Sequence, residues 1–405
     1  MKIKLTKTAV GVLMTMLFAV SPTLAEKDSA VPNSIVSGNT AFALGLYSVL
    51  KKEKGNLFFS PYSISAALAM TYGGARGDTA KEMKNTLRFP PDEKRTHLAF
   101  AELNATFDEV QKKAKVQLHI ANSLWPQKDH VFLPEYLTLM KQHYGSSITP
   151  VDYVKATEKA RKTINTWVED KTDEKIKDLI RQGDLDPQTV LVLVNAIYFK
   201  GNWASQFDPK RTKDADFTLL NGKKQQASMM YQKGKFRYKE IEGVQVLELP
   251  YVGKQLSMIL ILPGKPSGLP ELEAQLSVEN LASWLSSVRE QEVGVYLPRF
   301  KITWGTFELN KPLKALGMRK AFGSAADFSG MDGTKTLFIG LVLHKAFVEV
   351  NEEGTEAAAA TAVGMKLNGG LTFRADHPFV FLIRDNATGS ILFLGKVLDP
   401  NKKKN

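Results

Sequence analysis

The amino-acid sequence of 405 residues contains no cysteine. It can therefore form no disulfide framework, supply no thiolate nucleophile and hold no zinc through cysteine. Its six histidines include no two that lie four positions apart around a glutamate, so the helical motif of zinc hydrolases is missing. A Gly-x-Ser-x-Gly nucleophile elbow and a glycine-rich phosphate loop after a strand are missing as well. These absences indicate a protein that is not itself an enzyme, and they predict no cofactor and no bound metal.

Ordinary membrane-spanning runs are also missing near the N-terminus. The apolar run Ala9–Val20 has 12 residues, whereas a membrane-spanning helix needs about 20. It follows three lysines within the first seven residues and precedes small residues at Thr23 and Ala25. This order is typical of a secretory signal peptide that is cleaved after Ala25. We therefore expect residues 1–25 to be removed and the mature protein to be secreted or periplasmic.

Charge of one sign is not concentrated in any domain-sized part of the chain. The formal net charge is +12, but the lysines and arginines are interleaved with acidic residues. Such interleaving is typical of a solvated surface rather than of a nucleic-acid-binding face. A polyanion-binding role rests only on short basic runs such as Lys112, Lys113 and Lys115. We expect a monomer with no nucleic-acid partner and no membrane partner.

The distribution of periodic patterns predicts an α+β fold. Apolar residues recur with helical spacing in the first third of the chain, and strand patterns dominate the last half. The run Val190–Phe199 is apolar apart from Asn195, which predicts a strand covered on both faces. Thr79 and Glu82, three residues apart, predict a capping box at a helix start. Because no linker, repeat or low-complexity tract interrupts the chain, we expect residues 26–405 to form a single domain.

Individual elements follow from the same patterns. The expected helices are Asn39–Lys52, Ile64–Tyr72 and Asn310–Met318, and the stretch Glu158–Gln182 is expected to begin as a one-faced helix. The expected strands are Val116–Trp125, Val246–Tyr251, Leu256–Leu262, Val293–Phe300, Leu341–Val350, Phe379–Ile383 and Ile391–Val397. The last two strands flank a turn and should pair as a hairpin.

The stretch Glu352–Val363 differs from its surroundings because most of its side chains are small. It follows the expected strand Leu341–Val350 and contains Gly354, where the backbone can turn freely. Alanine is the best helix former, so a short helix is one interpretation. As a strand, the stretch would place its one charge beyond Gly354, Glu356, opposite a face of small residues. That uncharged face consists of Thr355, Ala357, Ala359, Thr361 and Val363. Composition alone supports a helix and a loop that can become a strand about equally.

A family resemblance decides between these interpretations. The stretch closely resembles the hinge of the reactive loop in inhibitory serpins, in the residues Glu352, Glu353, Gly354, Thr355, Glu356, Ala357, Ala358, Ala359, Ala360 and Thr361. Further segments match serpin landmarks in the right order: Asn56–Ser63, Ile164–Glu169, Leu193–Trp203, Leu297–Ile302, Asp327–Met331, His377–Arg384 and Gly389–Val397. The resemblance implies three β-sheets with surrounding helices, an exposed reactive loop at about residues 352–376, and a metastable fold. The chain resembles the inhibitory, secreted type of serpin, and we expect a bacterial source.

The resemblance also implies the positions of functional residues. The polar residues Ser60, Ser63, Asn195 and His344 would form a cluster beneath the centre of the main sheet, where it opens. Trp203 would be the buried aromatic at the top, where the loop first enters. Family spacing places the attacked bond at Leu367–Asn368, with Lys366–Leu367 second and Asn368–Gly369 third. Leucine suits the hydrophobic slot of chymotrypsin- or subtilisin-like proteases, and Lys366 suits a trypsin-like pocket.

The function implied is suicide inhibition of serine proteases, and also of papain-like cysteine proteases. The protease would form an acyl-enzyme with the loop, and the cleaved loop would then insert as a strand into the main sheet. The alternative is a non-inhibitory serpin-like carrier or folding helper. Such relatives often have bulky, charged or proline residues in the hinge, whereas this chain has glycine, threonine and alanine.

Overall fold

Two hydrogen-bonded sheets organise the part of the chain that the computed structural model describes, which is residues 30–402 without 115, 147 and 355–369. The smaller sheet has four strands in the order β2 (Gln117–Pro126), β3 (Leu191–Lys200), β10 (Leu341–Val350) and β9 (Phe300–Glu308). β3 and β10 pair in parallel, whereas β2 pairs β3 and β9 pairs β10 in the antiparallel direction. The two central strands are therefore the one parallel pair of this sheet.

The larger sheet has nine strands. Its main path runs through β1 (Leu57–Phe59), β13 (Ile391–Val397), β12 (Phe379–Asp385), β7 (Leu256–Pro263), β6 (Val244–Pro250), β5 (Lys224–Ile241), β8 (Arg289–Pro298) and β11 (Leu371–Arg374), and β4 (Lys213–Thr218) pairs β5. The 18-residue β5 pairs β6 near one end and β8 over a longer stretch, so it joins two segments that would otherwise be separate sheets. The three expected sheets thus correspond to the four-stranded sheet and to these two joined segments.

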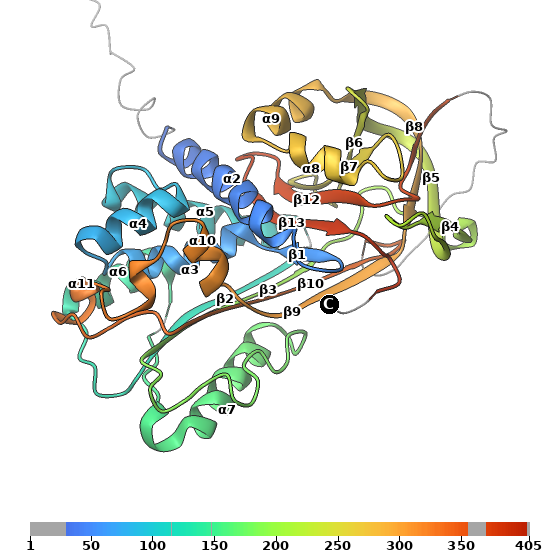
Figure 1. Ribbon diagram of the computed structural model, residues 1–405. Helices are drawn as coiled ribbons and strands as arrows, with labels where there is room; N and C mark the ends of the chain where they lie inside the picture. The colour runs from blue at the N-terminus through green and yellow to red at the C-terminus, as the bar shows by residue number, and fades with distance from the viewer. Residues whose placement is uncertain (1–29, 115, 147, 355–369, 403–405) are drawn as a thin grey trace, which may run out of the picture.

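Helices lie on both faces of the four-stranded sheet, and two further helices pack against β7 and β5 of the larger sheet. They are α2 (Ala30–Leu50), α3 (Pro61–Tyr72), α4 (Gly77–Leu87), α5 (Glu93–Ala114), α6 (Pro134–Tyr144), α7 (Tyr153–Lys171), α8 (Leu269–Gln275), α9 (Val278–Ser287), α10 (Asn310–Ala315) and α11 (Ser329–Asp332), with short 3-10 helices η1 (Pro209–Arg211) and η2 (Lys320–Phe322). Figure 1 shows α7 alone below the sheet, while the blue and cyan helices α2 to α6 lie above it. The α+β class expected from the sequence is confirmed. None of the helices within the described ranges is long and apolar enough to cross a membrane.

The side chains of β3 alternate between two hydrophobic cores. Val192, Val194 and Ala196 join the smaller core together with residues of α7, whereas Leu193 and Ile197 join the main core. Successive residues of a strand point to opposite faces, so both faces of β3 are buried. The strand covered on both faces that the apolar run predicts is confirmed.

Two local predictions differ from the structure in their bounds. The stretch Glu158–Gln182, expected to begin as a helix, is helical as far as Lys171, because Asp173 and Glu174 have positive φ angles of 48° and 57°, which a right-handed helix does not accommodate. The helix expected to be capped by Thr79 begins at Gly77 instead. The expected hairpin of β12 and β13 is confirmed by their antiparallel pairing.

Candidate functional site

The junction between β3 and β10 leads directly to the predicted hinge. The parallel pairing runs from Leu341 opposite Val192 to Phe347 opposite Tyr198. Beyond the end of β10 the chain reverses direction, since Asn351 and Gly354 form an antiparallel bridge. The start of the hinge is therefore a turn at the end of the two central strands.

Gly354 is required by the geometry of this turn. Its φ angle is +81°, in the region that favours glycine. A Cβ atom at this position would lie 2.4 Å from both the carbonyl oxygen of Gly201 and the backbone nitrogen of Trp203. The hinge can approach the segment that follows β3 this closely only because it has no side chain here.

Trp203 holds the hinge with two hydrogen bonds. Its indole Nε1 donates to the carbonyl of Asn351 at 2.9 Å, and its backbone N–H donates to the carbonyl of Glu353 at 3.0 Å. The indole is buried and stacks on Tyr251, with the ring centroids 4.7 Å apart. Trp203 therefore lies where the hinge meets the sheet, apart from the polar cluster beneath the centre.

The buried carboxylate of Glu352, the first hinge residue, anchors the start of the hinge. Arg299 Nε donates to the two carboxylate oxygens at 2.7 and 2.8 Å, the Thr212 hydroxyl donates to Oε1, and the Phe207 N–H donates to the Glu352 carbonyl at 2.9 Å. Burial alone would raise the pKa of Glu352, but the hydrogen bonds from Arg299 and Thr212 outweigh it, and the pKa lies below its usual value. Arg299, Thr212 and Phe207 are hinge contacts that the sequence did not point to.

The four residues of the predicted polar cluster do lie together. The Ser60 N–H donates to His344 Nε2 at 3.1 Å, and the Ser63 N–H donates to Ser60 Oγ at 3.1 Å. His344 Nδ1 bonds Asn195 Oδ1, and Asn195 Nδ2 donates to Ser63 Oγ at 2.5 Å. Asn195 on β3 and His344 on β10 are also partners in the strand register. The cluster therefore fastens the two central strands to each other and to the start of α3.

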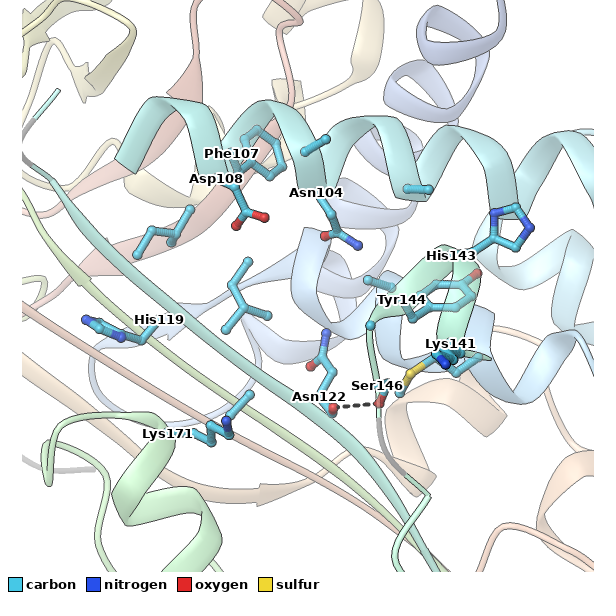
Figure 2. Close-up of a pocket in the computed structure, with 18 of the residues that line it drawn as sticks. Asn104, Phe107, Asp108, His119, Asn122, Lys141, His143, Tyr144, Ser146 and Lys171 are labelled. Carbon is cyan, nitrogen blue, oxygen red and sulfur yellow. Dashed lines mark hydrogen bonds between the residues drawn. The ribbon is translucent and has the colours of Figure 1, made fainter. Parts of the chain in front are cut away.

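Asn122 on β2 is a further member of this cluster. Its Oδ1 accepts hydrogen bonds from Asn195 Nδ2 and from the hydroxyl of Ser63. Figure 2 shows Asn122 beside a cavity of about 680 Å³ that is bounded by α5, α6 and β2, where its carbonyl accepts a bond from Ser146 at 3.0 Å. The cluster thus reaches three strands of the four-stranded sheet.

His344 is neutral in this environment. Complete burial lowers its pKa from 6.5 to about 3. Because Nε2 accepts a bond from the Ser60 N–H, the proton of the neutral ring is on Nδ1, which donates to Asn195. A charged imidazolium would lose this acceptor and would lie buried without a counter-ion.

We expect acidification to loosen the cluster. In the unfolded chain His344 binds a proton below about pH 6.5, whereas in the folded chain it does so only near pH 3, so folding stability falls as the pH drops between these values. The protonation of His344 in the unfolded chain lowers the free energy of unfolding by about 1.4 kcal/mol per pH unit at most. The thermal unfolding midpoint of the wild type should therefore fall more steeply from pH 7 to pH 4 than the midpoint of His344→Gln. Parallel curves for the two proteins would contradict the neutral, buried assignment.

Other predicted residues lie outside the described ranges. These are the hinge residues Thr355 to Thr361, the reactive-bond residues Lys366, Leu367 and Asn368, and the signal segment 1–25. Their roles stay predictions. Within the described ranges no group of three or more histidines and acidic residues could hold a metal ion.

A family model described as "Serpin (serine protease inhibitor)" matches residues 37–400. The chain belongs to the serpin family. It is 46% identical over 378 residues to the leukocyte elastase inhibitor of Homo sapiens, across 90% of this chain and 99% of that protein. The family is one of serine protease inhibitors and not of catalytic enzymes, which places this serpin among inhibitors rather than among enzymes.

Solved structures are similar over almost the whole chain. Serpin48 of the insect Tenebrio molitor has a TM-score of 0.81 and 35% identity, covering 93% of this serpin and 99% of that chain. Human thyroxine-binding globulin complexed with thyroxine has a TM-score of 0.83 and 32% identity, covering 92% and 100%. The relatives named here are animal proteins, so a bacterial source stays a prediction.

Proposed function

We propose that this serpin is a secreted suicide-substrate inhibitor that traps serine proteases by inserting its cleaved loop between β3 and β10. The parallel pairing of these two strands, with the hinge turn at their end, carries the proposal. A strand that returns from the Gly354 turn runs antiparallel to β10, and therefore also to β3. Its insertion would make every neighbouring pair of the sheet antiparallel, which is the slightly more stable arrangement.

The chemistry begins at the protease. Its nucleophile attacks the carbonyl of the bait residue, the following residue leaves as a free amine, and the serpin is held as an acyl-enzyme. Cleavage releases the hinge side of the loop, whose uncharged face of small residues can enter the sheet without burying a charge. Insertion then separates Asn195 from His344 and moves the attached protease before water can hydrolyse the ester.

The bait bond within the proposal is Leu367–Asn368. Leucine fits a hydrophobic pocket of chymotrypsin- or subtilisin-like proteases, whereas Lys366–Leu367 would fit trypsin-like proteases and Asn368–Gly369 is the third choice. The similarity to leukocyte elastase inhibitors supports a serine protease with an apolar pocket. Papain-like cysteine proteases are included because they form the same kind of acyl-enzyme.

Complex formation with a protease panel tests this function. We expect a serine protease to give a complex that survives SDS, and mass spectrometry of the released C-terminal fragment to show a start at Asn368. A start at Leu367 would shift the target class to trypsin-like proteases. Fragments that start far outside residues 366–370, or complete cleavage without any stable complex, would contradict the proposal.

The alternative of a non-inhibitory carrier or folding helper has a counterpart in the thyroxine-bound globulin. Gly354 and the small residues after it favour the inhibitor, because they let the hinge enter a sheet.

Secretion rests on the order of charged, apolar and small residues in segment 1–25. N-terminal sequencing of exported protein should begin at Glu26, and a retained Met1 would contradict it.

A further inference from the structure

Four side chains form a continuous stack on the larger sheet. Arg211 lies over the ring of Tyr231 with 4.2 Å to its centroid, Tyr231 and Tyr296 have centroids 4.6 Å apart, and Arg374 lies over Tyr296 at 4.5 Å. Tyr231 on β5 and Tyr296 on β8 are register partners. We call these four residues the Arg–Tyr stack.

The stack faces solvent on the outside of the sheet. Met230 and Gln232, on either side of Tyr231, are buried, as are Val295 and Leu297 beside Tyr296. The two tyrosines point to the opposite face and are partly exposed. Figure 1 shows β4, β5 and β8 together at one end of the molecule.

Both described ends of the reactive loop adjoin this stack. Arg211 precedes Thr212, whose hydroxyl binds Glu352 at the start of the hinge. Arg374 is on β11, which begins at Leu371 on the C-terminal side of the predicted reactive bond. The stack therefore extends from the anchor of one loop end to the strand of the other.

The stack carries two positive charges, and a carboxylate pairs with only one of them among the described residues. Arg374 Nε donates to Asp376 at 2.9 Å, so that guanidinium already has a carboxylate partner. Arg211 is exposed and has no ion-pair partner among the described residues, and its neighbours Lys210 and Lys213 are exposed as well. The end of the stack next to the hinge therefore presents an available guanidinium.

We propose that the Arg–Tyr stack is a secondary binding site for the target protease and that it recognises acidic side chains beside the protease's active-site cleft. The proposal rests on the proposed function, in which the protease docks on residues 366–368. Asn368 lies three residues before Leu371, so the attacked bond is within about 11 Å of β11. A protease interface covers about 800 Å² on each partner, which is wide enough to include the stack.

The composition of the stack fits such a contact. Tyrosine and arginine are among the residues most enriched at the energetically important positions of protein interfaces. The contact with Tyr231 restrains the Arg211 side chain, and a guanidinium held over a ring can still bind a carboxylate through two of its N–H groups. Lysine at this position would keep the charge and lose that geometry.

Binding of inactivated proteases tests the stack separately from trapping. Trypsin, chymotrypsin and leukocyte elastase, each with its nucleophilic serine replaced by alanine, are titrated against the full-length serpin and its variants. We expect Arg211→Ala to weaken Kd about fivefold to tenfold for at least one of them, and Arg211→Lys to recover only part of the loss. The matched control Lys239→Ala removes an exposed cation from the far end of β5 and should leave Kd unchanged.

The outcomes separate the two proposals. Arg211-dependent binding without any SDS-stable complex from active protease would uphold the secondary site and contradict the trapping mechanism. Equal Kd values for the wild type and Arg211→Ala with all three proteases would overturn the secondary site. Equal Kd values with a lower unfolding midpoint for Arg211→Ala would also overturn it, since the stack would then only stabilise the sheet. A salt dependence of Kd that is steeper for the wild type than for Arg211→Ala would support it.

Discussion

Cleavage within residues 366–368 is expected to raise the thermal unfolding midpoint by on the order of 10 °C. The hinge side would supply nine residues, Thr355 to Val363, as a new strand between β3 and β10. Each backbone hydrogen bond contributes about 1 kcal/mol net, so the gain is roughly 10 kcal/mol. Unfolding a chain of this size releases about 2 cal/mol/K per residue, which converts that gain into the stated shift.

Differential scanning of the intact and the loop-cleaved serpin measures this shift. The cleaved protein must be shown by mass spectrometry to carry one cut in the loop and no other. An unchanged or lower midpoint would mean that the cleaved loop does not enter the sheet, and would favour the non-inhibitory alternative.

Thr355→Arg is expected to convert the inhibitor into a substrate. Thr355 follows Gly354, which already lies against Gly201 and Trp203, so it is the first residue that would enter the sheet. An arginine there would bury an unpaired guanidinium at a cost of several kcal/mol. Insertion would then be slower than hydrolysis of the acyl-enzyme. Gel analysis should show cleaved serpin, free protease and at least a tenfold loss of SDS-stable complex.

Glu356→Arg is the matched control for this experiment. It introduces the same side chain one residue further on, where the alternation of a strand places it on the opposite face. We expect this variant to retain most of its complex formation. Equal loss in both variants would show that the charge itself, rather than the face it occupies, blocks trapping. Undiminished complex with Thr355→Arg would contradict the inward-facing position.

The elements with clear apolar periodicity could be predicted from the sequence. β3 and β10 are such cases, because runs of apolar or alternating residues in the sequence match the burial of their side chains. The cluster of His344 and Asn195 was implied by the serpin resemblance. The residues themselves indicate only that a polar side chain within an apolar run needs a buried hydrogen-bond partner. The long strand β5 was missed, since its many polar and charged residues give only a weak apolar alternation.

Contacts between distant segments could not be read from the sequence. Glu352 and its partner Arg299 are 53 residues apart, and no local pattern links them. Thr79 and Glu82 have the spacing of a capping box, yet Thr79 Oγ accepts the N–H of Asp327 and Glu82 accepts the N–H of Arg319. A local motif therefore identified residues that cap backbone groups, but the groups belong to a segment brought close only by the fold.

A disulfide across the β3–β10 junction tests the central claim most directly. The chain has no cysteine, and Ala196 and Lys345 are register partners on these strands, so Ala196→Cys with Lys345→Cys can be bridged. An inserted strand would separate the two positions to about 10 Å, which a disulfide cannot span. The account predicts that the oxidised protein is cleaved without trapping protease, and that the same protein after reduction forms the SDS-stable complex. Equal trapping by the oxidised protein, with its disulfide verified by mass, would contradict insertion between β3 and β10.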